Sequence, residues 1–185
     1  MPDLAGPKVA YLGYCGVIDS AGASKIAGML NAAVNEQYDS VQLAFSSPGG
    51  YIGDGMYLFH HMQALPIPVT IHNTGTVASI AVTVFVAAKR RICSPHGIFM
   101  MHPVKVPSDG MMAFEPLRAA LDAAVQDETR IDKILRERTK IPEEMLGQRR
   151  FREVYLSAKE ALEHGLIDEI AGLTVAPGNK IIQIG

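Results

Sequence analysis

Three short segments of the chain carry residues that could together catalyse acyl transfer. Ser79 lies among small and aliphatic residues in Val-Ala-Ser-Ile-Ala, where a substrate can reach its hydroxyl. His102 follows an apolar run typical of a strand, and an imidazole there could take the proton of the serine. Gly49 and Gly50 close the turn Ser-Ser-Pro-Gly-Gly, and without a Cβ their backbone can approach a substrate oxyanion closely. These residues favour a serine hydrolase.

Each of these residues also has an ordinary structural explanation. A serine at a helix start is commonly a cap, and a lone histidine after a strand is commonly part of the packing. The chain offers rivals to His102 in His60, His61 and His72. The adjacent His60 and His61 face different sides of a helix and so do not form a metal-binding pair. Taken singly, none of the three segments establishes catalysis.

The composition excludes several classes of protein. The 185 residues suit one large domain, and 48% of them are hydrophobic, which is enough for a sizeable core. A net charge of −2 and a pI of about 6.3 force no basic face, so we expect no nucleic acid partner. Cys15 and Cys93 are too few for a disulfide framework and too far apart for a metal knuckle. The chain has no P-loop and no His-Glu-x-x-His motif, so we expect no metal and no cofactor.

Nothing in the sequence indicates a membrane or secreted protein. The most apolar stretch, residues 77–88, is too short to cross a bilayer, and Lys89, Arg90 and Arg91 follow it. We expect this stretch to be a buried helix. The first eight residues show no basic segment followed by an apolar run, so no secretory signal is visible. A cytoplasmic location is expected.

Strand and helix patterns alternate along the chain, which predicts an α/β fold with a mainly parallel sheet. Predicted strands cover residues 9–14, 41–45, 69–72, 91–93, 98–101, 167–170 and 181–184. Predicted helices cover residues 20–37, a segment between Gly50 and Pro66, a segment from about residue 78, and residues 116–139, with a short helix after Pro142. Thr74, Gly75 and Thr76 are predicted to form a turn.

Three finer features of these elements can also be predicted. The long helix is expected to turn one apolar stripe inward, formed by Leu117, Leu121, Ala124, Ile131 and Leu135. Ser157 and Glu160 have the spacing of a capping box. Gly165 is expected to end the helix that follows in a left-handed conformation.

The ordered set of motifs resembles the Clp protease proteolytic subunit family. The set comprises the Pro-Gly-Gly turn, the segments around Ser79 and His102, and Tyr-Leu-Ser-Ala at 155–158 with residues 161–168. This resemblance, over residues 41–170, implies a crotonase-like spiral of ββα units in a single domain 1–185, with a protruding handle helix at about 104–140. It implies that Ser79 is the nucleophile and His102 the base, with the amides of Gly50 and Ile80 as oxyanion donors.

The same resemblance implies roles for further residues and partners. Glu153 occupies the position of the aspartate that orients the histidine, and Arg152 that of an arginine at the contact between rings. Gly49 and Val104 are expected to contact a peptide or unfolded protein substrate. The family's assembly implies a homo-oligomeric ring, stacked in pairs, and a AAA+ unfoldase in trans.

The departures from the family pattern keep two other hypotheses open. Glu153 is one methylene longer than aspartate. Residues 104–110 replace a glycine-rich strand, and Pro103 and Pro107 remove backbone donors in this region. The N-terminal loop that docks the ATPase is largely missing before the first strand. The first alternative is a catalytically weak or inactive subunit with an assembly or regulatory role. The second is a crotonase-type acyl-CoA enzyme, which the Ser79 and His102 pair and the short chain disfavour.

Overall fold

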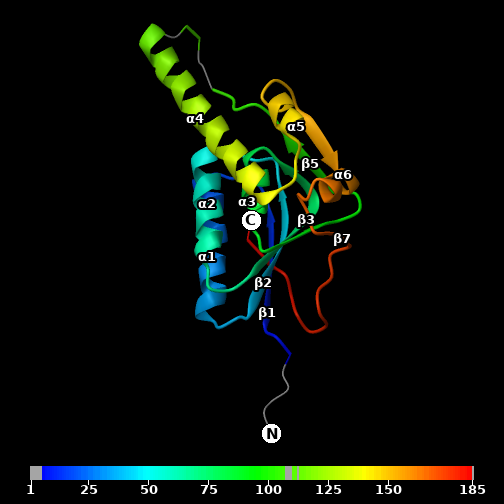
Figure 1. Cartoon of the computed structure of the whole chain (residues 1–185). Helices are drawn as coiled ribbons and strands as arrows, with labels where there is room; N and C mark the ends of the chain where they lie inside the picture. Colours follow the sequence, from blue (N-terminus) through cyan, green and yellow to red (C-terminus); the bar gives the residue numbers. More distant parts are fainter. Residues whose placement is uncertain (1–5, 107–109, 112, 185) are drawn as a thin grey trace.

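The computed structural model describes residues 6–106, 110–111 and 113–184, and its centre is a twisted, mostly parallel sheet (Figure 1). Three parallel strands form the middle of the sheet: β1 (Val9–Cys15), β2 (Ser40–Ser47) and β3 (Val69–Ala78). The helices α1 (Ser20–Asn35) and α2 (Ile52–Ala64) connect them and lie side by side next to the sheet. The predicted α/β class is confirmed, and the carboxyl ends of β2 and β3 meet at one edge, where sites form in such sheets.

Sequence patterns explain the first two connecting elements. The side chain of Asp19 caps α1 by accepting a hydrogen bond from the Gly22 amide at 2.7 Å. Ile26 and Leu30 then form a fully buried stripe at four-residue spacing. In β2 every second residue is buried, which is the pattern of a strand with one face on the core.

The prediction of a turn at Thr74–Thr76 is wrong, because β3 continues through these residues to Ala78. The strand changes partners on the way: residues 70–73 pair with β4 (Arg90–Cys93) and residues 76–78 with β5 (Ile98–Met101). The Asn73 side chain sits at the change, donating to the Ile98 carbonyl at 3.0 Å and accepting from the Gly75 amide at 2.9 Å. This extension brings Ser79 to the end of β3.

The second half of the chain completes the sheet. Helix α3 (Ile80–Phe85) is entirely buried and shorter than the helix predicted from the apolar run 77–88. Strand β6 (Val154–Ser157) pairs antiparallel with β5, and the short strands β7 (Glu169–Ile170) and β8 (Ile182–Gln183) pair parallel with β4 and β1. The Ser157–Glu160 capping box of α6 (Ala158–Glu163) and the left-handed Gly165 are confirmed.

Helix α4 (Phe114–Arg138) projects from the rest of the molecule (Figure 1). Its predicted inward stripe is wrong for the first half of the helix, because Leu117 and Leu121 are 43% and 55% exposed. Only the last turns, with Ile131 and Leu135, pack on the core. Part of the segment that precedes α4, residues 107–109, lies outside the described residues.

A buried ion cluster joins the base of α4 to the end of α5 (Glu143–Gln148). Asp132 of α4 is 1% exposed and Arg149 is 2% exposed, and the Nε of Arg149 donates to Oδ1 of Asp132 at 2.9 Å. The second carboxylate oxygen accepts from Nε of Arg150 at 3.0 Å. Because both oxygens are paired, the charge is tolerated inside the protein, and it fixes α4 against α5.

Removing the carboxylate should be costly. Asp132→Ala is expected to lower the free energy of unfolding by about 3–5 kcal/mol, because it leaves the Arg149 guanidinium buried without one of its counter-charges. Urea unfolding followed by circular dichroism measures this. The matched control is Glu137→Ala on the same helix, whose 4.0 Å contact with Lys133 is solvent-exposed and should contribute less than about 1 kcal/mol. Equal losses in the two variants would contradict a structural role for the cluster.

Candidate active site

Ser79 has an unusual backbone conformation at the junction of β3 and α3. Its φ is +58° and its ψ −132°, in a region that residues with a side chain rarely adopt. The Ser79 amide donates to the Met100 carbonyl of β5 at 2.8 Å, which holds the turn in place. In the described structure the hydroxyl does not cap α3, so the ordinary role of a serine at a helix start does not apply. A sharp strand-to-helix turn presents the nucleophilic serine in α/β-hydrolases.

The glycine turn packs directly on Ser79. Gly49 and Gly50 have φ values of +98° and +155°, and a Cβ built on Gly49 would lie 2.5 Å from the Cβ of Ser79. Hydrogen bonds of 2.8 Å from the Ile18 amide to the Gly49 carbonyl and from the Tyr51 amide to the Ile18 carbonyl fasten the turn to the chain after β1. This bridge does not use the Gly50 amide. Only glycine fits at Gly49, and the Gly50 amide can serve another acceptor.

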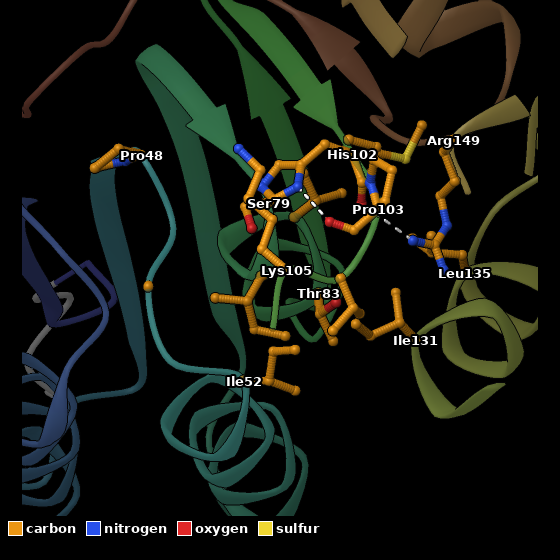
Figure 2. Close-up of a pocket in the computed structure, with 15 residues that line it drawn as sticks. Pro48, Ile52, Ser79, Thr83, His102, Pro103, Lys105, Ile131, Leu135 and Arg149 are labelled. Carbon is orange, nitrogen blue, oxygen red and sulfur yellow. Dashed lines mark hydrogen bonds between the residues drawn. The ribbon is translucent and has the colours of Figure 1, made fainter. Parts of the chain in front are cut away.

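Ser79 and His102 line the same pocket, together with Gly50, Ile80 and Val104 (Figure 2). The pocket therefore contains the expected nucleophile Ser79, the expected base His102 and both expected oxyanion donors, Gly50 and Ile80. It also contains Val104, one of the two expected substrate contacts. The other, Gly49, lies against Ser79.

The hydrogen bond of His102 defines its tautomer. Nδ1 lies 2.6 Å from the Pro103 carbonyl oxygen, drawn as a dashed line in Figure 2. A carbonyl can only accept, so Nδ1 is the protonated nitrogen of the neutral ring. Nε2 then carries the lone pair that a general base needs.

Glu153 and Arg152 lie apart from this group. Glu153 is exposed just before β6, and its Oε2 accepts a hydrogen bond from the Tyr155 hydroxyl at 2.7 Å. That bond raises the pKa of the Tyr155 phenol. Glu153 is not among the residues that line the pocket. Arg152 is also exposed, and its Nη2 donates to Oε1 of Gln148 at 2.5 Å.

Two charged residues that sequence reasoning missed hold the segment that carries His102. Oε1 of Glu128 accepts from the Val104 amide at 2.6 Å, and Nη1 of Arg149 reaches the His102 carbonyl at 3.4 Å. Glu128 and Arg149 also form an ion pair at 2.6 Å. The sequence contains one signal for this role. Glu128 and Asp132 are four residues apart, so they lie on one face of α4, next to the apolar residues Ile131 and Leu135.

The other candidate groups do not lie in the pocket. His72 is buried on β3 with Nε2 3.0 Å from the Ser94 hydroxyl, and burial lowers its pKa. Burial raises the pKa of the Cys93 thiol to about 11, which leaves little thiolate for nucleophilic attack. The described residues contain no cluster of three or more histidine, cysteine or acidic side chains that could hold a metal.

Comparisons with known proteins agree with this fold. The family model for Clp protease matches residues 10–173, so the chain belongs to the Clp protease family. It is 29% identical to ATP-dependent Clp protease proteolytic subunit 3 of Rhizobium etli, over 84% of this chain and 80% of the relative. It is 30% identical to the ATP-dependent Clp protease proteolytic subunit of Chlorella vulgaris, over 89% and 81%.

A solved structure of another protein has the same fold. A mutant of ClpP1 from Listeria monocytogenes matches with a TM-score of 0.76, at 22% identity, over 87% of this chain and 90% of that chain. This likeness confirms the predicted spiral fold. Within the described residues, no helix combines the length and the apolar character needed to span a bilayer.

Gly49 should tolerate no side chain. Gly49→Ala is expected to lower the free energy of unfolding by about 1–3 kcal/mol, because it places a Cβ at positive φ and against Ser79. Gly53→Ala is the control, since a Cβ there meets nothing within 4 Å on helix α2, and it should raise stability by about 0.5–1 kcal/mol. Chemical unfolding distinguishes the two, and a shift in the same direction would refute the close approach of the turn to Ser79.

Proposed function

We propose that the chain is a serine peptidase that hydrolyses unstructured peptides through an acyl-enzyme. The observation that carries the proposal is the shared pocket of Ser79 and His102, in which the histidine tautomer leaves Nε2 free to act as a base. Membership of a family whose relatives are named proteolytic subunits supports a peptidase.

The mechanism follows from the roles of these groups. Nε2 of His102 takes the proton of the Ser79 hydroxyl as Oγ attacks the substrate carbonyl. The amides of Gly50 and Ile80 hold the oxyanion of the tetrahedral intermediate. The imidazolium returns its proton to the leaving amine, and water then attacks the acyl-enzyme with His102 again acting as base.

The proposal assigns the orientation of His102 to the Pro103 carbonyl and not to Glu153. A backbone carbonyl fixes the ring and tautomer of a histidine as a carboxylate does, although it carries only a partial charge. Glu128 and Arg149 support this arrangement, since they anchor the amide of Val104 and the carbonyl of His102 on either side. They are positioning residues and do not touch the reacting atoms.

The proposal also includes an assembly. We treat residues 1–185 as one peptidase domain with a handle at about 104–140 that forms homo-oligomeric rings in the cytoplasm, with unfolded proteins delivered by a AAA+ unfoldase. The exposed apolar residues Leu117, Leu121 and Val125 of α4 support burial against another copy. Arg152 is the proposed contact between rings.

One observation favours a second candidate function. Glu153 bonds to Tyr155 and is exposed, which suits a subunit that has lost catalysis and serves assembly or regulation. The two functions differ in whether Ser79 reacts with an acylating or phosphonylating reagent.

A fluorophosphonate probe should label the protein at Ser79. Labelling should vanish in Ser79→Ala, and any peptidase activity should fall by about 10⁴-fold or more, as in dissected triads. Ser24→Ala, which removes an exposed hydroxyl from α1, is the control and should be labelled like the parent. Mass spectrometry of the intact protein and of its peptides gives the site. A protein that stays unlabelled and cleaves no peptide would instead be the inactive subunit.

Substitutions of Glu128 and Glu153 test which group keeps His102 in position. Glu128→Met should lower kcat by about 10²-fold, because the segment carrying His102 loses its anchor and even 1 Å of misplacement is costly. Glu128→Gln keeps an oxygen for the Val104 amide and should restore most of the rate. Glu153→Gln should change kcat by less than about threefold, whereas a catalytic orienting acid would cost about 10⁴-fold. A loss of that size in Glu153→Gln would return the role to Glu153.

A further inference from the structure

The pocket extends away from Ser79 into a region with apolar walls. Five aliphatic residues from three helices line it, namely Ile52, Ile80, Val82, Ile131 and Leu135. One polar residue, Thr83 of α3, lies among them, and Figure 2 shows it below His102 and between Ile52 and Ile131. Thr83 and Ser79 line the same pocket, so a substrate bound at Ser79 lies close to both residues.

The hydroxyl of Thr83 has no partner within the described structure. Thr83 is 1% exposed, and its Oγ1 makes no hydrogen bond there. A threonine in a helix usually bonds to the carbonyl four residues earlier. That carbonyl belongs to Ser79 and accepts instead from the Val82 amide at 3.1 Å. A buried hydroxyl without a hydrogen-bond partner lowers the stability of the folded protein, and a valine at this position would avoid that loss.

We propose that Thr83 selects the acyl residue, the substrate residue whose carbonyl Ser79 attacks, and that this residue has an uncharged side chain with a hydrogen-bonding tip, such as glutamine. The inference rests on the proposed function, because it needs Ser79 as the nucleophile. The side chain next to the attacked carbonyl must occupy the space beside Ser79. An apolar stem contacts Ile52 and Ile131, and the amide at its tip pairs with the Thr83 hydroxyl.

A charged tip is disfavoured by the pairing of the nearby charges. Arg149 lines the pocket, but its guanidinium already pairs with Asp132 and Glu128. The other cationic residue that lines the pocket, Lys105, is exposed, so its charge is screened by solvent. A substrate carboxylate or ammonium beside the buried Thr83 would therefore lose its hydration with little compensation. A neutral amide loses less hydration and gains the hydroxyl of Thr83.

The test compares two peptides that differ only in the acyl residue, glutamine or methionine, whose unbranched side chains have nearly the same length. The wild-type protein should cleave the glutamine peptide with about tenfold higher kcat/KM, the size expected of one neutral hydrogen bond. Thr83→Val keeps the shape of the side chain and should reduce this preference by about tenfold. Thr129→Val, whose hydroxyl bonds to the Val125 carbonyl on the exposed part of α4, should leave the preference unchanged. An equal ratio in wild type and Thr83→Val overturns the inference.

A second measurement does not depend on turnover. Because valine removes an unpartnered polar group, Thr83→Val should raise the Tm of the free protein. A lower Tm would mean that the hydroxyl is already paired, and the inference would fail.

The outcomes also separate this inference from the proposed function. If Ser79 is labelled and both peptides are cleaved equally, only the selection by Thr83 is refuted. If Ser79 is unlabelled and neither peptide is cleaved, the peptidase proposal fails, and the role of Thr83 fails with it.

Discussion

The left-handed backbone of Ser79 is the constraint on which the candidate site depends. A residue with a side chain adopts such a conformation only when its surroundings hold it there. Here the Met100 carbonyl binds the Ser79 amide, and Gly49 packs against the side chain with no Cβ of its own. The ends of strands β2, β3 and β5 must therefore lie close to one another at one edge of the sheet. This is possible because β3 pairs with β4 up to Asn73 and with β5 beyond it.

The second half of the site depends on a buried charge cluster and not on the sheet. His102 lies beyond the end of β5, where no strand pairing fixes it, and the surrounding backbone is held by Glu128 and Arg149. Arg149 is itself fixed by Asp132. Since Glu128 and Asp132 belong to α4, the base of the projecting helix and the proposed general base share one network. A displacement of the helix base would thus change the position of His102.

The sequence predicted local patterns well and long-range relations poorly. The capping box at Ser157 and the left-handed conformation of Gly165 depend on neighbours within a few residues, and both are confirmed. The length of β3 was missed because the Thr-Gly-Thr segment has the composition of a turn, while its strand conformation comes from pairing with β5. Leu117 was predicted to be buried because periodicity reports an apolar face but not what covers it. The order of the motifs did predict that Ser79 and His102 share a site, and both residues line one pocket.

The exposed Glu153 does not by itself imply an inactive protein. A histidine base needs a fixed tautomer and ring orientation, and the Pro103 carbonyl supplies both at 2.6 Å. What a neutral carbonyl supplies less of is electrostatic stabilisation of the imidazolium, since its oxygen carries only a partial charge. The oxyanion donors usually make the larger contribution to acyl transfer, and the turn that would provide the Gly50 amide is hydrogen-bonded to Ile18 and packs on Ser79. In the proposed peptidase, this geometry would therefore slow the reaction and would not abolish it.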